Sequence, residues 1–338
     1  MVEKCPHLSI NGFAIEKERG DIMAGIFITG ASGMLGMYLA SSLLAKKHKV
    51  IAVDSKPNDF VGKNPNYVFL QCDITDKNAI TDLLNKNAND IQTFVHLACS
   101  VDNDIDSYVT DEEVKKSKVA DKFIYEAAIN ARVKNIILLS TTHVYGVPKG
   151  REPIRETAEL KGASNYVDMK LNAEKMLMKD IRKTAIVPVI ARVAPVYTSE
   201  YTQNLRDKVY DPKEDVAFVY RDGEYGFSFC CVFNLVDFIN GIVAIPQGRY
   251  EGIYNVADTR MITAREILEH EREHHRIGAV IQKNMTGDTL KNLVPLGKNR
   301  QKMDYRFFDP SMIGNNWNID NTKAQRIATF RWNLKNTK

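Results

Sequence analysis

This chain lacks several features that would place it in a special class of protein. It has no run of about 18 apolar residues and no signal-peptide core at its polar N-terminus, so we expect a cytoplasmic protein that makes no membrane contact. Only five cysteines occur among 338 residues, with no C-x-x-C pair, which favours reduced thiols over a disulfide framework. The 46 basic and 42 acidic residues leave a net charge of only +4, which predicts no general affinity for nucleic acid.

The remaining composition is that of a globular protein with a sizeable core, since 44% of the residues are hydrophobic and 26% are charged. Apolar strand-like runs alternate with helical patterns, and the runs are residues 25–29, 50–54, 67–72, 93–98, 135–140 and 185–192. This alternation predicts an α/β fold, a doubly wound parallel sheet of the Rossmann type. We expect an N-terminal extension (1–22), a dinucleotide-binding domain (23–198) and a smaller α+β substrate lobe (199–338) with short returns to the sheet.

A glycine-rich turn between the first strand and the first helix organises the chain. Gly30 permits a sharp exit from the strand, Gly33 leaves the backbone open to a pyrophosphate, and Gly36 lets the helix pack closely. The free amides at the start of that helix, residues 34–47, attract phosphate charge. The second strand ends at Asp54, whose carboxylate suits a ribose 2′-hydroxyl. These features in this order predict a dinucleotide site.

Two further polar residues close neighbouring strands. Asp73 directly follows the third strand, where a carboxylate can accept a hydrogen bond from an adenine amino group. His96 lies near the end of the fourth strand and invites a catalytic role. Within an apolar strand, however, a buried histidine with hydrogen-bond partners is the more frequent case, and we favour it here.

A tyrosine and a lysine follow the fifth strand at helical spacing. Tyr166 and Lys170 are four residues apart and share one face of a predicted helix. The ammonium group stabilises a phenolate and lowers its pKa from about 10, and the hydroxyl of Thr141 can hold the same substrate oxygen. A pair at this spacing is usually a surface pair by chance. The preceding glycine turn and Asp54 favour catalysis.

These motifs resemble the extended short-chain dehydrogenase/reductase superfamily, in particular its NAD-dependent nucleotide-sugar epimerase/dehydratase branch. Residues 29–36 (TGASGMLG) resemble its TGxxGxxG, residues 96–98 its HLA strand end, and residues 140–146 (STTHVYG) its SSxxVYG. Tyr166 and Lys170 match its YxxxK motif. Weaker likenesses lie at residues 191–197, 252–257 and 320–324.

The resemblance implies NAD as the cofactor, a nucleotide sugar as the substrate, no metal, and a homodimer formed through the helices near residues 111–131 and 165–182. It implies Thr141, Tyr166 and Lys170 as the catalytic residues. The cofactor-binding residues that it implies are Gly30, Ser32, Gly33, Met34, Leu35, Gly36, Asp54, Asp73, Ile74, Leu97, Ala98, Tyr166 and Lys170. The substrate-binding residues that it implies are Thr142, His143 and Arg306.

The departures from the family bear on the reaction. Dehydratases of the family carry an Asp-Glu pair after the catalytic Thr, and decarboxylases a Glu before the Val, whereas this chain has Thr142 and His143 there. Without a carboxylate to move a proton at the neighbouring carbon, we expect neither dehydration nor decarboxylation. Phe227 replaces an Arg that grips the diphosphate in many members, while Arg306 keeps the position of a second such group.

Three functions remain open. We expect an epimerase or oxidoreductase in which Tyr166 takes the proton of a sugar hydroxyl, Lys170 tunes the phenol and Thr141 orients the oxygen. A one-way ketoreductase or dehydrogenase is the alternative among enzymes. A dinucleotide-binding protein without catalysis is the alternative outside them, because a fold alone does not fix a function.

Two local motifs lie in the predicted substrate lobe. Residues 221–223 (Arg-Asp-Gly) predict a hairpin turn between two apolar runs. Residues 270–274 read H-E-x-x-H, a spacing that supplies two zinc ligands in metallohydrolases, on a helix that begins with a capping box from Thr263 to Glu266. That helix carries charge nearly all round and indicates no third ligand, so we expect a solvated helix and no metal catalysis.

Overall fold

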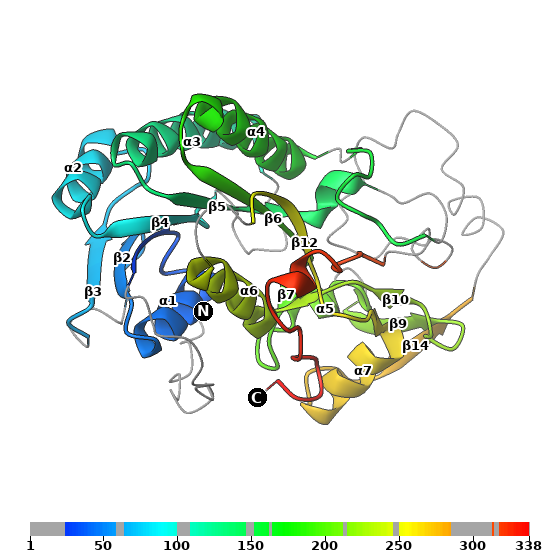
Figure 1. Ribbon diagram of the computed structural model, residues 1–338. Helices are drawn as coiled ribbons and strands as arrows, with labels where there is room; N and C mark the ends of the chain where they lie inside the picture. The colour runs from blue at the N-terminus through cyan, green and yellow to red at the C-terminus, as the bar shows by residue number, and fades with distance from the viewer. Residues whose placement is uncertain are drawn as a thin grey trace.

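The computed structural model describes residues 24–58, 64–99, 109–146, 152–161, 164–211, 215–245, 250–284, 313 and 318–337. Its centre is a seven-stranded sheet in the order β12-β6-β5-β4-β1-β2-β3 (Figure 1). All of its strand pairs are parallel. The strands are β1 (Gly25–Thr29), β2 (Lys49–Asp54), β3 (Tyr67–Gln71), β4 (Ile91–His96), β5 (Asn135–Thr141), β6 (Val187–Val193) and β12 (Gly252–Val256). The predicted fold class is confirmed, and β12 is a return of the C-terminal half to the sheet.

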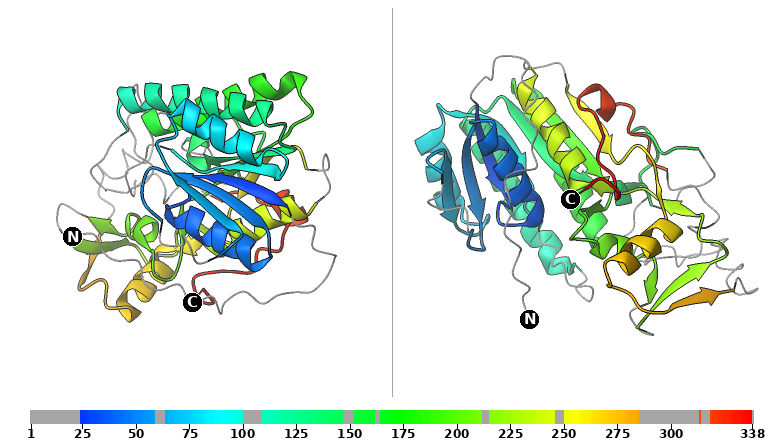
Figure 2. Two further views of the ribbon diagram at one scale, coloured as in Figure 1. Left: turned by 90° about the vertical axis from the view of Figure 1, so that its left-hand side faces the viewer. Right: turned by 90° about the horizontal axis from the view of Figure 1, so that it is seen from below.

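Helices cover both faces of this sheet. One face carries α2 (Lys77–Asn87), α3 (Asp111–Asn130) and α4 (Asn165–Asp180), and the other carries α1 (Met34–Ala45) and α6 (Val232–Ala244), as Figures 1 and 2 show. Side chains along a strand alternate between the two faces, so Ile26 and Ile28 enter the core beneath α1 and α6 while Phe27 enters the other core.

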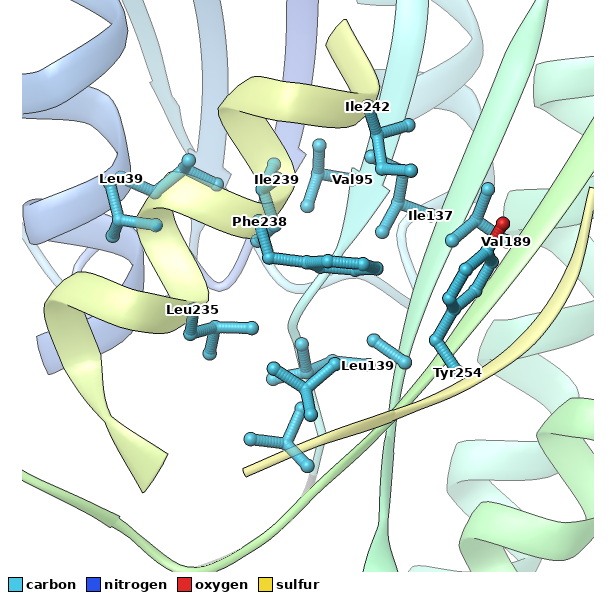
Figure 3. Close-up of a cluster of buried hydrophobic side chains, with 14 of the residues drawn as sticks. Leu39, Val95, Ile137, Leu139, Val189, Leu235, Phe238, Ile239, Ile242 and Tyr254 are labelled. Carbon is cyan, nitrogen blue, oxygen red and sulfur yellow. The ribbon is translucent and has the colours of Figure 1, made fainter. Parts of the chain in front are cut away.

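The core beneath α6 fixes the middle of the sheet. Phe238 and Ile239 of α6 point toward Val95 and Ile137 of the central strands (Figure 3). Phe238 is fully buried, and burial of a side chain of this size contributes about 1.5–3 kcal/mol. This packing holds β4 and β5 in place, and their carboxyl ends carry the candidate site.

Short elements build the smaller lobe, which lies to one side of the large sheet (Figure 1). Its strands form a two-stranded sheet β10-β13, a pair β11-β7 and a three-stranded sheet β14-β9-β8. Its elements are β7 (Val196–Tyr197), α5 (Gln203–Arg206), β8 (Tyr210–Asp211), β9 (Val216–Tyr220), β10 (Gly226–Phe227), β11 (Cys230–Cys231), β13 (Ile262–Thr263), α7 (Ala264–Glu273) and β14 (Val280–Lys283). Three 3-10 turns complete the described elements: η2 (Thr142–Tyr145), η3 (Ile181–Lys183) and η5 (Ala324–Arg326).

The predicted hairpin at residues 221–223 is wrong. A turn does form there, since Gly223 has a φ of 76° and its amide donates to the carbonyl of Tyr220 at 3.1 Å. The flanking strands do not pair with each other, because β9 pairs with β8 and β14 whereas β10 pairs with β13. The side chain of Arg265 binds the carbonyl of Asp222, which draws the turn toward α7.

The expectation of a solvated helix at residues 264–273 is also wrong. The capping box from Thr263 to Glu266 is present, but one face of α7 is buried in the core of the lobe. Ile267, Leu268 and Glu271 share this face at spacings of three and four residues. Glu271 is fully buried, and its charge is offset by Arg276 at 3.4 Å. Within the described ranges, no helix has the length and apolar character needed to cross a bilayer.

Candidate active site

The strand order places the site. It reverses direction between β1 and β4, and ligands of open parallel sheets bind beyond the carboxyl ends of the strands at such a point. The two strand ends are linked here, because the amide of Leu97 donates to the carbonyl of Thr29 at 3.2 Å. The amide of Ala98 donates to the Thr29 hydroxyl at 3.3 Å. The glycine turn follows β1 directly and faces this junction.

The three glycines of the turn are required for different reasons. Gly30 has a φ of 74°, and a Cβ atom on it would lie 2.8 Å from the Ala98 nitrogen. A Cβ atom on Gly36 would lie 2.3 Å from the Gly30 carbonyl oxygen. A Cβ atom on Gly33, by contrast, would meet that oxygen at 3.5 Å, an ordinary contact. The fold therefore requires Gly30 and Gly36, whereas at Gly33 it leaves a cradle that a side chain would fill and that fits a pyrophosphate.

Asp54 ties the end of β2 to the glycine turn. Its carboxylate accepts from the Ser32 amide and from the Lys56 amide, each at 2.9 Å. A carboxylate has about four lone-pair positions, so acceptor capacity remains for ribose hydroxyls. The contact with Ser32 places the carboxylate of Asp54 beside the glycine turn, and its role toward a ribose stays a prediction.

Asp73 lies just after the end of β3, as predicted, and its carboxylate already accepts hydrogen bonds from the protein. It accepts from the Thr75 amide at 2.9 Å and from the Thr75 hydroxyl at 2.8 Å. Lys116 of α3 binds its second oxygen at 3.1 Å. The hydrogen bonds from Thr75, and then Lys116, lower the pKa of Asp73. Asp73 is therefore a fixed anion beside Ile74, at the position expected for the adenine.

His96 is a buried histidine with a partner on each ring nitrogen. Its Nδ1 lies 2.7 Å from the Thr29 hydroxyl, and its Nε2 lies 3.0 Å from Asp121 of α3. Its exposed fraction is 2%. The preferred interpretation of His96 as a core residue agrees with this geometry.

The predicted catalytic residues lie at the end of β5 and on the helix that packs against this strand. Thr141 is the last residue of that strand, and Tyr166 and Lys170 lie on the first two turns of α4, whose start is fixed by the Ser164 cap. The Lys170 ammonium donates to the carbonyl of Leu139 at 3.0 Å and lies 5.8 Å from the centre of the Tyr166 ring. The arrangement can hold one oxygen and move its proton.

The charge state of Lys170 follows from its neighbours. Burial is the largest single influence and disfavours its charged form, but the charge interactions with Cys99, Tyr166 and Asp121 and a hydrogen bond with Cys99 together outweigh it, so the pKa of Lys170 is raised. Lys170 is thus a buried cation at neutral pH, as the stabilisation of a phenolate requires. The thiol of Cys99 is a hydrogen-bond neighbour of Lys170. The spacing of the sequence motifs did not predict this contact.

Thr142 and His143 follow Thr141 in η2. The amide of His143 donates to the Thr141 hydroxyl at 3.2 Å, and the His143 ring lies 6.5 Å from the Tyr166 ring in an edge-on arrangement. Thr142 is buried with an exposed fraction of 7%. His143 thus borders the candidate catalytic tyrosine. Arg306, the third predicted substrate residue, lies outside the described residues, and Phe227 packs in the core of the small lobe.

A buried polar network that sequence analysis missed supports the site from behind. Glu174 lies one turn after Lys170 on α4 and accepts from the Ser140 hydroxyl at 2.5 Å. It binds Arg192 of β6 through two contacts, at 3.1 and 2.7 Å. Arg192 donates to the Tyr145 hydroxyl at 3.1 Å, and that hydroxyl donates to Asn255 of β12 at 2.6 Å.

The Glu174–Arg192 pair is nearly inaccessible to water, since the side chains are 7% and 3% exposed. Burial alone would lower the pKa of Arg192, but its hydrogen bonds and charge contact with Glu174 raise it. The pair therefore stays ionised and joins α4 to the two strands that flank the site. Arg192 stands in residues 191–197, one of the segments with a weaker likeness to the family, and Glu174 lies four residues after Lys170. These two positions were the signals in the sequence from which the pair could have been predicted.

Comparisons with known proteins agree with this geometry. The chain matches the model of the "NAD dependent epimerase/dehydratase family" over residues 26–257. It is 24% identical to UDP-glucuronic acid decarboxylase 1 of Arabidopsis thaliana over 294 residues, which are 83% of this chain and 65% of that protein. The chain thus spans about two thirds of the length of that relative.

Two solved structures share the fold. MoeE5 in complex with UDP-glucuronic acid and NAD aligns with a TM-score of 0.68 and 18% identity, covering 93% of this chain and 96% of the other. UDP-glucuronic acid 4-epimerase from Bacillus cereus in complex with NAD aligns with a TM-score of 0.68 and 17% identity, covering 93% and 95%. At these identities the likeness shows a common fold.

Proposed function

This chain belongs to the NAD-dependent epimerase/dehydratase family, and from that premise we propose that it is an epimerase that acts on a sugar hydroxyl of a nucleotide sugar. It is an enzyme of the extended short-chain dehydrogenase/reductase type, and NAD is the cofactor of its family. The observation that supports the proposal is that Thr141 ends β5 while Tyr166 and Lys170 lie on α4, whose Lys170 ammonium donates to the carbonyl of Leu139 in β5.

The residues that would hold NAD surround the switch in strand order. The open position at Gly33 would receive the pyrophosphate, Asp54 would accept from the ribose hydroxyls, and Asp73 would hold the adenine. Bound NAD supplies a hydride acceptor that, in an epimerase, returns the hydride to the other face of the same carbon. The carboxylate of Asp54 repels a 2′-phosphate, so NAD should bind more tightly than NADP.

The protein supplies the proton transfer. Tyr166 takes the proton of the sugar hydroxyl as the carbon is oxidised, and gives it back when the carbon is reduced. Lys170 is kept cationic in its buried position, and in this proposal its charge stabilises the phenolate form of Tyr166. Thr141 donates to the same sugar oxygen and keeps it within reach of Tyr166. The Glu174–Arg192 pair keeps α4, and with it this geometry, fixed against β5.

Epimerisation is favoured over loss of water or carbon dioxide by the residues beside Thr141. Thr142 and His143 provide no carboxylate at that point of η2. The relative from Arabidopsis thaliana is a decarboxylase, and the Bacillus cereus structure is a UDP-glucuronic acid 4-epimerase. UDP-glucuronic acid and UDP-glucose are therefore the first substrates to test.

The test is to incubate the protein and NAD with each of these two sugars and to identify the product by NMR. The proposal expects an epimeric sugar and no net accumulation of NADH. Stoichiometric NADH with an oxidised sugar would establish a one-way dehydrogenase instead, and loss of carbon dioxide would establish a decarboxylase. A protein with NAD bound that changes neither sugar would contradict the choice of substrate.

We also propose a homodimer formed through α3 and α4. These helices lie side by side on the outside of the sheet (Figures 1 and 2), and they expose Val119 and Met178 by 50% and 40%. In the same proposal, residues 199–338 form mainly the lobe that binds the sugar, apart from α6 and β12, which belong to the large sheet. Light scattering that shows a monomer at micromolar concentration would contradict the dimer.

A further inference from the structure

Asn255 of β12 is a polar residue buried in the large sheet, with an exposed fraction of 0%. Strand β12 lies at the edge of that sheet, where it pairs with β6. The backbone amide of Asn255 donates to the carboxylate of Glu156 at 2.9 Å. A buried side-chain amide is costly unless its atoms are hydrogen-bonded, so the partners of Asn255 show which segments it holds together.

The side chain of Asn255 uses all of its polar atoms. Its Nδ2 atom donates to the carbonyl of Ile154 at 3.0 Å and to the carbonyl of Asp320 at 3.2 Å. Its Oδ1 atom accepts from the Tyr145 hydroxyl at 2.6 Å. Because a carbonyl can only accept, the orientation of the amide is fixed by these partners. Figure 1 shows the C-terminal segment, in red, beside β12. Asn255 therefore joins β12 to three other segments.

The first of these segments is η2, which ends at Tyr145. The Tyr145 hydroxyl also accepts from Arg192 at 3.1 Å, and the side chain is buried. At the other end of η2, the Thr141 hydroxyl accepts from the His143 amide at 3.2 Å. A hydroxyl that accepts from an amide keeps its own hydrogen for donation to another group. The geometry of η2 thus directs the hydroxyl that is proposed to donate to the sugar.

The second segment, residues 152–161, lies in the chain between η2 and α4. Ile154 forms a parallel bridge with Ile319, and its amide donates to the carbonyl of Asn318 at 2.8 Å. Arg192 donates to the carbonyl of Glu156 at 3.3 Å. The connection between the two elements that carry the candidate catalytic groups is therefore fixed to the sheet edge, and Asn255 is bonded to it at two points.

We propose that Asn255 is a positioning residue of the active site, which fixes Tyr145 and with it η2, so that the Thr141 hydroxyl stays directed at the sugar oxygen. This inference rests on the proposed function, in which Thr141 donates to that oxygen. Asn255 acts through the Tyr145 hydroxyl and through residues 154–156. A misplacement of about 1 Å in such a group can cost about a hundredfold in rate.

The test compares Asn255→Ala with a matched control, Asn234→Ala. Asn234 of α6 is also 0% exposed, and its side chain likewise makes three hydrogen bonds, to Asp258 and to the backbone of Trp332. None of these partners lies in η2 or α4. Both variants should lower the Tm. Below both Tm values, only Asn255→Ala should lower the turnover of the nucleotide sugar, by about tenfold or more, while its NAD affinity stays near that of the wild type.

Tyr145→Phe gives a second, milder variant, because it keeps the buried ring and removes the hydroxyl that Asn255 and Arg192 share. It should lower turnover in the same direction. Since the two residues are proposed to act as a unit, the double variant should lose little more than the more affected single variant. If Asn255→Ala does not fold, Tyr145→Phe takes its place in each comparison with Asn234→Ala.

Amide hydrogen exchange followed by mass spectrometry tests the positioning role without any substrate. Peptides that cover residues 141–146 should exchange faster in Asn255→Ala than in the wild type, and should be unchanged in Asn234→Ala. Unchanged exchange in Asn255→Ala, or an equal fall in turnover in both variants, would overturn the proposal. If the wild type converts no nucleotide sugar, the proposed function fails, and the exchange of η2 still decides whether Asn255 fixes that element.

Discussion

The large sheet and the small lobe each contain a buried glutamate on a helix that pairs with arginine. The two pairs differ in their contact distances and in the exposure of the arginines. Glu174 meets Arg192 through two contacts of 3.1 and 2.7 Å, and both side chains are at most 7% exposed. Glu271 of the lobe meets Arg276 at 3.4 Å and Arg206 at 3.7 Å, and these arginines are 25% and 31% exposed.

These differences in distance and exposure indicate what each pair contributes to the structure. The pair in the sheet lies one helical turn from Lys170, where a displacement of α4 would move the candidate catalytic groups. The pair in the lobe is shared between two partly hydrated arginines, and it holds α7 against its core without fixing one geometry. We therefore expect substitutions on the sheet side to have sharper effects than their counterparts in the lobe.

The largest effect should come from the group that the sheet pair positions. Tyr166→Phe keeps the ring and removes the proton acceptor, so turnover of a nucleotide sugar should fall by about 10²- to 10⁴-fold. Affinity for NAD, measured by calorimetry, should change little. Lys170→Ala should impair both turnover and NAD binding, because the family resemblance implies Lys170 as a cofactor-binding residue as well as a catalytic one. Full activity in Tyr166→Phe would remove the proposed mechanism.

The two arginines can be compared directly. Arg192→Met should lower the free energy of unfolding by about 3–5 kcal/mol, because it leaves the carboxylate of Glu174 buried without its partner. Arg276→Met should cost less, since Glu271 retains Arg206 and the lost arginine was partly hydrated. Urea denaturation of the two variants measures how much unfolding free energy each one loses. Equal losses would mean that the two pairs do not differ as described.

Asp258 lies at the junction of the two regions, and its titration should make the free energy of unfolding depend on pH. This carboxylate accepts from Tyr197 at 2.7 Å, from the Cys231 amide at 2.8 Å and from Asn234 at 2.7 Å. Burial outweighs these hydrogen bonds and raises the pKa of Asp258 to about 6.

In the unfolded chain that pKa is about 3.9, so between pH 4 and 6 the folded protein binds more protons than the unfolded one. The stabilisation due to protonated Asp258 is therefore complete below about pH 4 and is lost as the pH rises to about 6, by at most about 3 kcal/mol. The Asp258→Asn variant should lack this decrease. Identical pH profiles of unfolding free energy for the variant and the wild type would show that the carboxylate does not titrate in this range.

The smallest effects separate a glycine that the fold needs from one that the ligand needs. Gly36→Ala should lower stability by about 1–3 kcal/mol, because its Cβ atom would lie 2.3 Å from the Gly30 carbonyl oxygen. Gly33→Ala should leave stability nearly unchanged and weaken NAD binding by about tenfold or more, equivalent to about 1.4 kcal/mol. Thermal unfolding and NAD titration of both variants test this. Unchanged NAD binding in Gly33→Ala would show that the cradle does not hold the pyrophosphate.

The sequence allowed the cofactor side of the site to be predicted because its determinants are local. Gly30 and Gly33 lie in the turn between β1 and α1, Gly36 lies in the first turn of α1, and Asp54 ends the next strand. Tyr166 and Lys170 share a helical face by spacing alone. The family resemblance rested on the same segments and is confirmed by the family match.

Other features depend on which segments become neighbours, and spacing does not encode that. Glu174 and Arg192 meet only because α4 packs on β5 and β6. Glu271 can be buried on α7 partly because the remote Arg206, more than 60 positions earlier, lies 3.7 Å from its carboxylate. The predicted hairpin failed for a related reason, since β10 pairs with β13, about 35 residues later. Short strands with remote partners carry little local signal.

The most direct test of the central claim is the absorbance of reduced nicotinamide after the NAD-bound protein is mixed rapidly with UDP-glucuronic acid or UDP-glucose. The account predicts that the absorbance rises as the sugar is oxidised and falls again as the epimer forms, and that Tyr166→Phe suppresses the rise while still binding NAD. An epimer that forms at full rate in Tyr166→Phe, or NAD that stays oxidised while the wild type converts the sugar, would contradict it.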